Sequence, residues 1–320
     1  MSEESKIENL NSKIAYIFPG QGSQAVGMGK DLFDSFPASR EVFQEADDAL
    51  GFKLSEMCFA GDEADLQLTA NTQPAILTTS VAAFRAMESE GFPSPDYVAG
   101  HSLGEYSALV AARAMSFADA VKTVRKRGTY MQEAVPVGVG AMAAVIGLPL
   151  ETVETACADA AESDVCSPAN INSPSQIVIA GNAEAVDRAI VLLKERGAKR
   201  AIKLNVSAPF HCALMLPAQA KLAEDLQEIN FVDLRFPIIE NVSAEANTKG
   251  ERVRAALTEQ VSKPVRWARS VENLITQGVT TFVEAGAGKI LSGLVRQINR
   301  DVRCLNVENF DSLKQAVPML

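Results

Sequence analysis

The chain has 320 residues, of which 47% are hydrophobic and 22% charged, and its formal net charge is -10. These values are typical of a globular protein with a sizeable core, in one large domain or two modest ones. The acidic balance argues against a nucleic-acid partner, because a surface that follows phosphates needs concentrated Lys and Arg. The cysteines are odd in number, widely spaced and without a Cys-x-x-Cys pair, which disfavours disulfides and zinc and favours a reducing compartment.

The first dozen residues are polar and acidic and lack the apolar run of a signal peptide, so we expect a short frayed N-terminus. The longest apolar stretch, residues 137–150, is interrupted by glycines and is too short to span a bilayer. The sequence therefore predicts a cytoplasmic protein with no membrane partner.

The first predicted strand, residues 14–18, leads into a glycine turn at residues 19–24, and helical patterns then dominate up to about Glu90. A second strand, residues 97–99, ends at the tight turn Gly100-His101-Ser102-Leu103-Gly104, which an alanine-rich helical stretch follows. This order is typical of an α/β domain with a parallel sheet.

Shorter alternating units follow from Gly138 onward. We expect strands at 141–147, around Ile171, at 176–180 and at 200–206, and helices at 151–161 and 183–196. The resulting β-α-β-β-α-β order predicts a ferredoxin-like subdomain.

The rest of the chain contains a loop with His211, another helix, and strands near residues 237–242 and 281–283 that we expect to return to the large sheet. We therefore predict a large α/β domain, residues 1–136 and 207–320, and an inserted small subdomain, residues 137–206. A cleft between them would be the natural site.

The glycines on both sides of Ser102 let the backbone bend sharply, so we expect its hydroxyl to project above the sheet while the amides of a helix N-terminus point at its substrate. A serine hydroxyl needs a base within hydrogen-bond reach, and the chain has two histidines. His101 adjoins Ser102 at an extended strand end and should point to the opposite side, whereas His211 can approach from a separate loop. We predict Ser102 as nucleophile and His211 as base. The structural alternatives are a chance turn and a histidine satisfied by other partners.

The turn at residues 20–25 matches the Gly-x-Gly-x-x-Ala pattern of dinucleotide-binding loops, so a nicotinamide-dependent oxidoreductase is one alternative. That pattern requires an acidic residue at the end of a second strand, yet Glu41 and Glu45 fall in a predicted helix. The same turn can instead present the main-chain amide of Gln21 to an oxyanion that forms beside Ser102.

The basic run Arg125-Lys126-Arg127 lies on a predicted helix. At about 100° per residue, Lys126 points nearly opposite the apolar stripe, while Arg125 and Arg127 flank it. An inward arginine would need an anionic partner, and its fork of donors suits a carboxylate. The pattern does not separate the two arginines.

Several motifs, in this order, closely resemble those of malonyl-CoA:acyl carrier protein transacylases, and together they span nearly the whole chain. They are Phe18 to Gln24, Gly100 to Tyr106, Arg127 to Gln132, Asn170 to Gly181, Pro209 to Met215, Gln260 to Trp267, and Glu284 to Leu294. The resemblance implies a hydrolase-like α/β domain with a ferredoxin-like insertion. It also implies an enzyme that moves a malonyl group from coenzyme A to the phosphopantetheine thiol of acyl carrier protein through an acyl-serine, supplying fatty acid biosynthesis without a tightly bound cofactor or metal.

The resemblance assigns the nucleophile to Ser102 and the base to His211, and it implies an oxyanion hole formed by the amides of Gln21 and Leu103. It further implies that the main-chain carbonyl of Gln260 orients the histidine in place of the usual Asp.

By the same resemblance, Arg127 would clamp the malonyl carboxylate. The chain departs from the family pattern at Phe210, where Ser is frequent, and at residues 286–288, where Gly-Pro-Gly is frequent. Phe210 also occurs in malonyl-selective relatives, so we expect it to favour malonyl over branched groups.

A serine hydrolase of related fold is the second alternative, and it should carry an acid between its serine and its histidine in the chain. The candidate acids are Asp119, Asp159, Asp164 and Asp187.

An acidic carrier protein would need a local basic surface on this acidic chain. The candidate surfaces are one cluster of Lys199, Arg200 and Lys203 and another of Arg296, Arg300 and Arg303.

Overall fold

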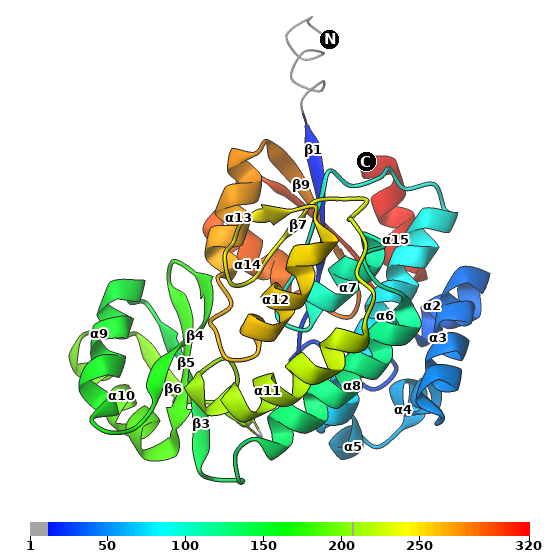
Figure 1. Ribbon diagram of the computed structural model, residues 1–320. Coiled ribbons are helices and arrows are strands. Elements are labelled where there is room, and N and C mark those ends of the chain that lie inside the picture. Colours follow the sequence, from blue (N-terminus) through cyan, green and yellow to red (C-terminus); the bar gives the residue numbers. More distant parts are fainter. Residues whose placement is uncertain (1–11, 207) are drawn as a thin grey trace, which may run out of the picture.

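The computed structural model describes residues 12–206 and 208–320, so residues 1–11, where we expect a frayed end, and Ser207 lie outside the described residues. Within these ranges the larger sheet has six strands in the order β10-β9-β1-β2-β7-β8 (Figure 1). Its strands are β1 (Lys13–Phe18), β2 (Tyr97–Gly100), β7 (Ile238–Ile239), β8 (Ala246–Asn247), β9 (Val279–Ala285) and β10 (Arg303–Val307). All pairs in this sheet are parallel except β7 with β8. The predicted parallel sheet, and the return of the C-terminal strands to it, are confirmed.

The central strand β1 is buried on both faces because its side chains alternate between two cores. Tyr16 and Phe18 pack into the core that holds much of α6 and α7, whereas Ala15 and Ile17 pack with residues of α13 and α14. Helices therefore cover both faces of the large sheet (Figure 1).

The helices outside the small sheet group into three segments of the chain. The N-terminal group is α2 (Lys30–Ser35), α3 (Pro37–Leu50), α4 (Leu54–Ala60), α5 (Glu63–Gln67) and α6 (Thr69–Ser89). The middle group is α7 (Gly104–Ala111) and α8 (Phe117–Glu133). The C-terminal group is η2 (Ala213–Met215), α11 (Leu216–Asp225), η3 (Leu226–Glu228), α12 (Gly250–Gln260), α13 (Trp267–Thr276), α14 (Ile290–Ile298), α15 (Phe310–Ala316) and η4 (Val317–Met319).

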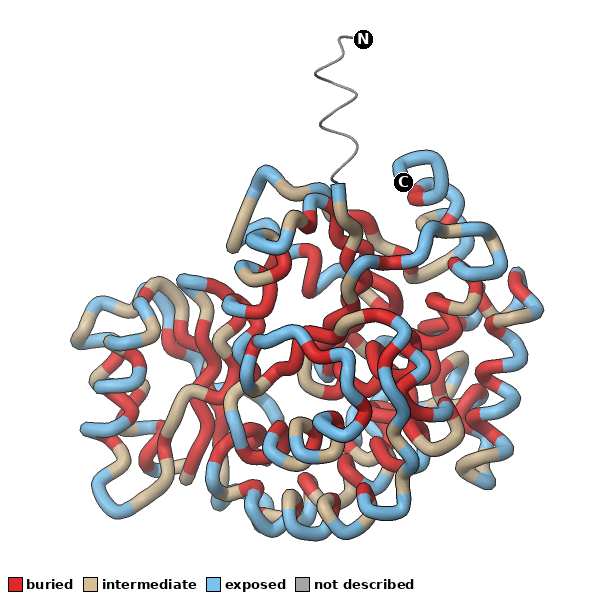
Figure 2. The backbone as a smooth tube through the Cα atoms, turned by 45° about the horizontal axis from the view of Figure 1, so that its top comes forward, coloured by how far each residue is buried: buried red, intermediate tan, exposed pale blue. Residues whose placement is uncertain are grey.

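The smaller sheet is antiparallel throughout and has the order β4-β5-β3-β6. It is built from β3 (Gly140–Ile146), α9 (Leu150–Ala161), β4 (Cys166–Ser173), β5 (Gln176–Asn182), α10 (Ala183–Glu195) and β6 (Arg200–Lys203). Both helices lie on one face of the sheet and enclose a separate apolar core (Figures 1 and 2). The predicted β-α-β-β-α-β order is present, although the last strand ends at Lys203 rather than at Val206.

The two sheets and their separate cores support the proposed division into residues 1–136 with 207–320 and residues 137–206. Backbone hydrogen bonds connect the two parts, because Ile171 donates to Val265 O at 2.9 Å and Val265 donates to Ala169 O at 2.9 Å. The side chain of Ser173 also donates to Gln297 Oε1 at 3.0 Å. Strand β4 is thus held against the segment that joins α12 to α13.

Candidate active site

Ser102 lies at the sharp turn between β2 and α7, where its φ is 51°. The flanking glycines make this turn possible. A Cβ on Gly100 would lie 1.9 Å from backbone atoms of Gly104, and one on Gly104 would lie 2.0 Å from Phe18 O. Residues without side chains are therefore needed on both sides of the serine, and a strained backbone of this kind exposes the hydroxyl above the sheet.

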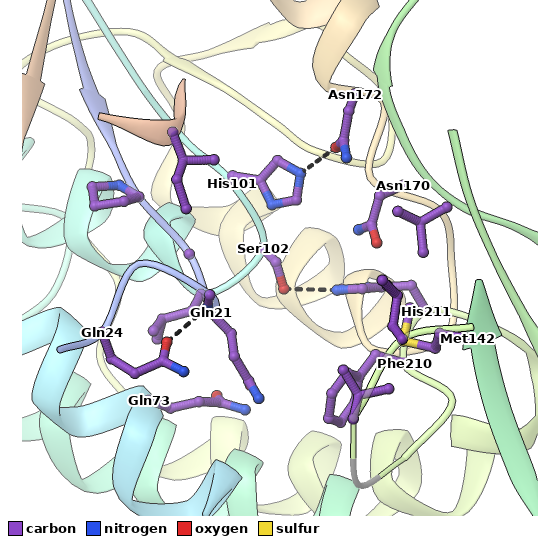
Figure 3. Close-up of a pocket in the computed structure, with 18 of the residues that line it drawn as sticks. Gln21, Gln24, Gln73, His101, Ser102, Met142, Asn170, Asn172, Phe210 and His211 are labelled. Carbon is purple, nitrogen blue, oxygen red and sulfur yellow. Dashed lines mark hydrogen bonds between the residues drawn. The ribbon is translucent and has the colours of Figure 1, made fainter. Parts of the chain in front are cut away.

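His211 faces this hydroxyl although the two residues are far apart in the chain (Figure 3). Ser102 Oγ and His211 Nε2 are 2.7 Å apart, and His211 Nδ1 lies 2.8 Å from the main-chain oxygen of Gln260. Because the carbonyl of Gln260 can only accept, Nδ1 carries the proton and Nε2 is left to accept from the serine hydroxyl. The structure thus brings together Ser102 and His211, the pair predicted from the residues, and Gln260, which the family resemblance placed behind the histidine.

His101 makes other contacts, as expected from the alternation along the strand end. Its Nε2 lies 2.8 Å from Asn172 Oδ1 (Figure 3). Its ring also packs against Trp267, with centroids 5.7 Å apart.

Burial, and secondly the Arg127 guanidinium, lower the pKa of His211 to about 3. A neutral imidazole is the form that can accept a proton, so His211 is ready to act as a base at neutral pH.

Arg127 reaches the same point from α8 and is 2% exposed. Its Nη1 donates to Gln73 Oε1 at 2.7 Å, and its Nη2 donates to Gln260 Oε1 at 2.9 Å and to Ser102 Oγ at 3.1 Å. All three acceptors are neutral groups. Arg125 instead contacts Asn71 and lies over the ring of Phe52, so the structure separates the two arginines that the sequence left equivalent.

Gln21 and Leu103 both line the cavity next to Ser102. The glycine turn approaches the serine turn closely, since a Cβ on Gly20 would lie 2.4 Å from His101 O. Within residues 12–206 and 208–320, the main-chain amides of Gln21 and Leu103 have no acceptor. Two free amides beside a nucleophile are the donors that an oxyanion requires.

The cavity has a volume of about 800 Å³ and is lined by both parts of the chain (Figure 3). The large domain contributes Ser102 and Arg127, and the small sheet contributes Met142, Asn170 and Val178. Phe210 also lines the cavity, beside the base.

Helix α14 borders the cavity through Ile290, Leu291 and Leu294. Two amides of its first turn are already occupied, because Leu291 N and Ser292 N donate to the carboxylate of Glu284 at 3.0 and 2.7 Å.

Sequence reasoning missed Gln73, Glu105, Asn241 and the side-chain role of Gln260. Gln73 could have been found as a long amide side chain in α6, whose buried residues are otherwise mostly small, hydroxylated or apolar, because a buried amide needs a partner. Asn241 follows a strand of two residues and gives no local signal.

Among the residues that it describes, the structure does not supply those that a nicotinamide-dependent oxidoreductase or a serine hydrolase would need at this site. The helix after the glycine turn begins at Lys30, well beyond the turn, and Glu41 and Glu45 lie within α3. The four candidate acids have partners of their own. Asp119 caps α8 with Ser116, and Asp159, Asp164 and Asp187 pair with Arg196, Arg188 and Lys203.

In the described part of the chain, no three His, Cys, Asp or Glu side chains gather where they could hold a metal ion. No helix in these ranges has the length and apolar character that crossing a membrane requires.

The family model described as "Acyl transferase domain" matches residues 15–311. The chain is 50% identical over 310 residues to the malonyl CoA-acyl carrier protein transacylase of Bacillus subtilis (strain 168), covering 97% of this chain and 98% of that protein. A crystal structure of an acyl carrier protein S-malonyltransferase from Vibrio cholerae superposes with a TM-score of 0.94 at 48% identity, covering 95% and 100% of the two chains. A malonyl-transacylase solved in complex with a type II polyketide synthase acyl carrier protein gives a TM-score of 0.94 at 45% identity, over 97% and 100%.

Proposed function

The chain belongs to the acyl transferase family, among its malonyl CoA-acyl carrier protein transacylases, and on that basis we propose that Ser102 and His211 carry out its reaction. The enzyme transfers a malonyl group from coenzyme A to the phosphopantetheine thiol of acyl carrier protein and so supplies fatty acid biosynthesis. The observation that carries the proposed residue roles is the meeting of Ser102 Oγ with His211 Nε2 at 2.7 Å and with Arg127 Nη2 at 3.1 Å.

In the first half-reaction, His211 Nε2 takes the proton of Ser102 while Oγ attacks the thioester carbonyl of malonyl-CoA. The amides of Gln21 and Leu103 hold the negative oxygen of the tetrahedral intermediate, where losing one donor typically costs about 10²- to 10³-fold in rate. The intermediate collapses, the carbon–sulfur bond breaks, and the sulfur of coenzyme A leaves with the proton from His211. The product is a malonyl ester of Ser102.

In the second half-reaction, His211 takes the proton of the carrier thiol, and the sulfur attacks the ester carbonyl. The ester bond breaks, and Ser102 regains its hydroxyl proton from His211. Because the acyl group waits on the enzyme between two substrates, the kinetics are ping-pong.

Arg127 binds the malonyl carboxylate in this scheme. A buried cation is costly unless an anion pairs with it, and the three acceptors around Arg127 are neutral. The substrate carboxylate supplies that anion. The contact from Nη2 to Ser102 Oγ, at 3.1 Å, is the one that the carboxylate can replace. Phe210 narrows the same cavity and would disfavour branched groups.

The orienting group behind His211 supports transfer over a hydrolase with a Ser-His-acid triad, because a neutral main-chain oxygen occupies the position of the acid.

We further propose a cytoplasmic location, which the five free thiols support.

Carrier docking is proposed at one of the two basic clusters. Lys203 is paired with Asp187, and Arg296 and Arg303 donate to main-chain oxygens. Charge reversal of Arg200 or Arg300 at low salt tests each cluster, and an unchanged KM for the carrier excludes the one concerned.

The decisive experiment is incubation with malonyl-CoA followed by intact-protein mass spectrometry and peptide mapping. The wild-type protein should gain one malonyl group on Ser102, and Ser102→Ala should gain none. A malonyl adduct that persists on Ser102→Ala would refute the assignment.

A further inference from the structure

Glu105 is a buried carboxyl group close to the reacting residues that the proposed mechanism does not use. It lies on α7, one turn after Ser102, and is 2% exposed. Its Oε2 accepts from Gln260 Nε2 at 2.5 Å, and both of its oxygens lie 3.3 Å from the main-chain nitrogen of Asn241. In every hydrogen bond that the structure gives to this side chain, a carboxyl oxygen of Glu105 is the acceptor.

Gln260 carries the contact that sets the orientation of the base. Its main-chain oxygen lies 2.8 Å from His211 Nδ1, and its side-chain oxygen accepts from Arg127 at 2.9 Å. Its side-chain nitrogen is shared between Glu105 and Ser102 O, the latter at 2.9 Å. A shift of the Gln260 side chain would therefore disturb the surroundings of the base, the cation and the nucleophile together.

Asn241 holds the backbone of the turn that carries Ser102. Its Oδ1 accepts from Ser102 N at 2.7 Å, and its Nδ2 donates to Gly100 O at 2.6 Å, so it connects the two ends of the bend. Non-glycine residues with positive φ persist only where surrounding contacts hold them. Asn241 supplies such contacts at Ser102, and Glu105 fixes the backbone of Asn241.

We propose that Glu105 is a positioning residue for acyl transfer, which holds Gln260 and Asn241 together so that His211 and Ser102 keep their reactive geometry. The proposal rests on the roles assigned above to Ser102 and His211. Glu105 contacts neither the imidazole nor the serine hydroxyl. It therefore acts through the length of its side chain and the hydrogen bonds that it accepts, and not by proton transfer.

The negative charge of Glu105 is not required for this task. Burial raises the pKa of its carboxyl to about 8, against the lowering effect of the Gln260 contact. Oε2 alone faces both donors, at 2.5 and 3.3 Å, so a single amide oxygen at the same place can serve them.

Two substitutions of Glu105 distinguish the effect of its side-chain length from the effect of its carboxyl group. Glu105→Gln keeps the length of the side chain and one acceptor, whereas Glu105→Asp keeps the carboxyl group but withdraws it by one methylene. We expect kcat of Glu105→Gln to stay within about threefold of wild type, and kcat of Glu105→Asp to fall about 10²-fold, the cost of a displacement near 1 Å in a reacting pair. Equal activity of the two variants, or a more active Asp variant, would overturn the proposal.

A matched control distinguishes positioning from general loss of stability. Asp47 is also a buried carboxylate that accepts from a main-chain amide and a side-chain donor, Ser55 N at 2.9 Å and Ser55 Oγ at 2.6 Å, but it lies on α3 away from the cavity. Asp47→Ala should lower Tm at least as much as Glu105→Asp while leaving kcat unchanged. If the stability loss in Asp47→Ala reduces kcat equally, the Glu105 effect is structural and the proposal fails.

Substrate binding gives a second readout. In a Ser102→Ala background, which cannot react, Glu105→Asp should change Kd for malonyl-CoA by less than about threefold, because Arg127 keeps its Gln73 contact. A tenfold weaker Kd would mean that the cavity itself has collapsed and would refute a positioning role.

The labelling experiment with malonyl-CoA tests the role of Ser102 separately from the role of Glu105. Loss of the Ser102 assignment overturns the proposed residue roles, whereas a correctly labelled Ser102 with indifferent Glu105 variants overturns this inference alone.

Discussion

Replacing Arg127 with methionine should change the pH range in which Ser102 reacts. Burial, and secondly the Arg127 cation, lower the pKa of His211 to about 3, so the wild-type base stays neutral in weakly acidic solution. Arg127 Nη2 and His211 Nε2 lie 3.1 and 2.7 Å from the same Ser102 oxygen. With the two charges about 5 Å apart and an effective dielectric constant of about 20, Coulomb's law gives a repulsion of about 3 kcal/mol, or roughly two in pKa.

Removing the cation therefore raises the pKa of His211, and the rate of the variant should fall at a higher pH than that of wild type. Below its pKa the imidazole is protonated and cannot act as a base, so reactivity is lost as pH falls through that value. Wild type should keep its rate down to about pH 5, whereas Arg127→Met should have lost half of its rate there. Burial remains in the variant, so the pKa stays below the ordinary value of a histidine.

The assay is the second-order rate of Ser102 labelling by diisopropyl fluorophosphate between about pH 4.5 and 8. This probe has no carboxylate, so it does not depend on Arg127 for binding. Arg125→Met is the matched control, because Arg125 contacts Asn71 and Phe52 instead of the serine. If the profile of Arg127→Met coincides with that of wild type, the electrostatic account of His211 is wrong.

Three other outcomes can be checked directly. Gly100→Ala should lower the free energy of unfolding by about 3 kcal/mol or more, because the added Cβ would meet backbone atoms at 1.9 Å, whereas Gly293→Ala, with nothing within 4 Å, should raise it by about 0.5–1 kcal/mol in urea titrations. Gln73→Leu should reduce the ratio of kcat/KM for malonyl-CoA over acetyl-CoA by about tenfold, since Arg127 Nη1 loses its acceptor, and an unchanged ratio would count against this. Ellman's reagent should react with one thiol of the native protein, the partly exposed Cys304, and slowly, because burial raises the pKa of that thiol. All five thiols should react in denaturant, and reaction of a second thiol in the native protein at the rate of Cys304 would contradict the burial of the others.

The serine turn and the small subdomain could be predicted because their signals are local. A strand, a glycine-flanked serine and a helix are adjacent in the chain, and each element of the subdomain is long enough to show its period. Short strands carry less information. β10 is five residues long and its charged and polar residues, Arg303 and Asn306, are three positions apart, so it shows no period of two. β8 has two residues, and neither strand was predicted.

The choice between Arg125 and Arg127 required the structure. Their positions on α8 are symmetric about the apolar stripe, and the packing of α8 against α6 decides between them. A Cβ on Gly128 would lie 2.6 Å from Thr69 O, so α8 approaches α6 closely at this point and Arg127 faces Gln73. The rotation of α8 about its own axis decides which arginine points inward, and this rotation is set by the helices packed against α8.

The group that orients the base could not be derived from residue types either. The contact comes from the main-chain oxygen of Gln260, and every residue has such an oxygen. Family resemblance supplied this position, whereas propensity and spacing could not.

The occupied first turn of α14 has a consequence for the departure of coenzyme A. Helix starts commonly retain phosphates, through free amides and the positive end of the dipole. Here Glu284 already accepts from two of these amides beside the cavity, so those two amides are not free to hold the polyanionic tail of coenzyme A. Once its sulfur has given up the malonyl group, little on this side delays its replacement by the carrier arm.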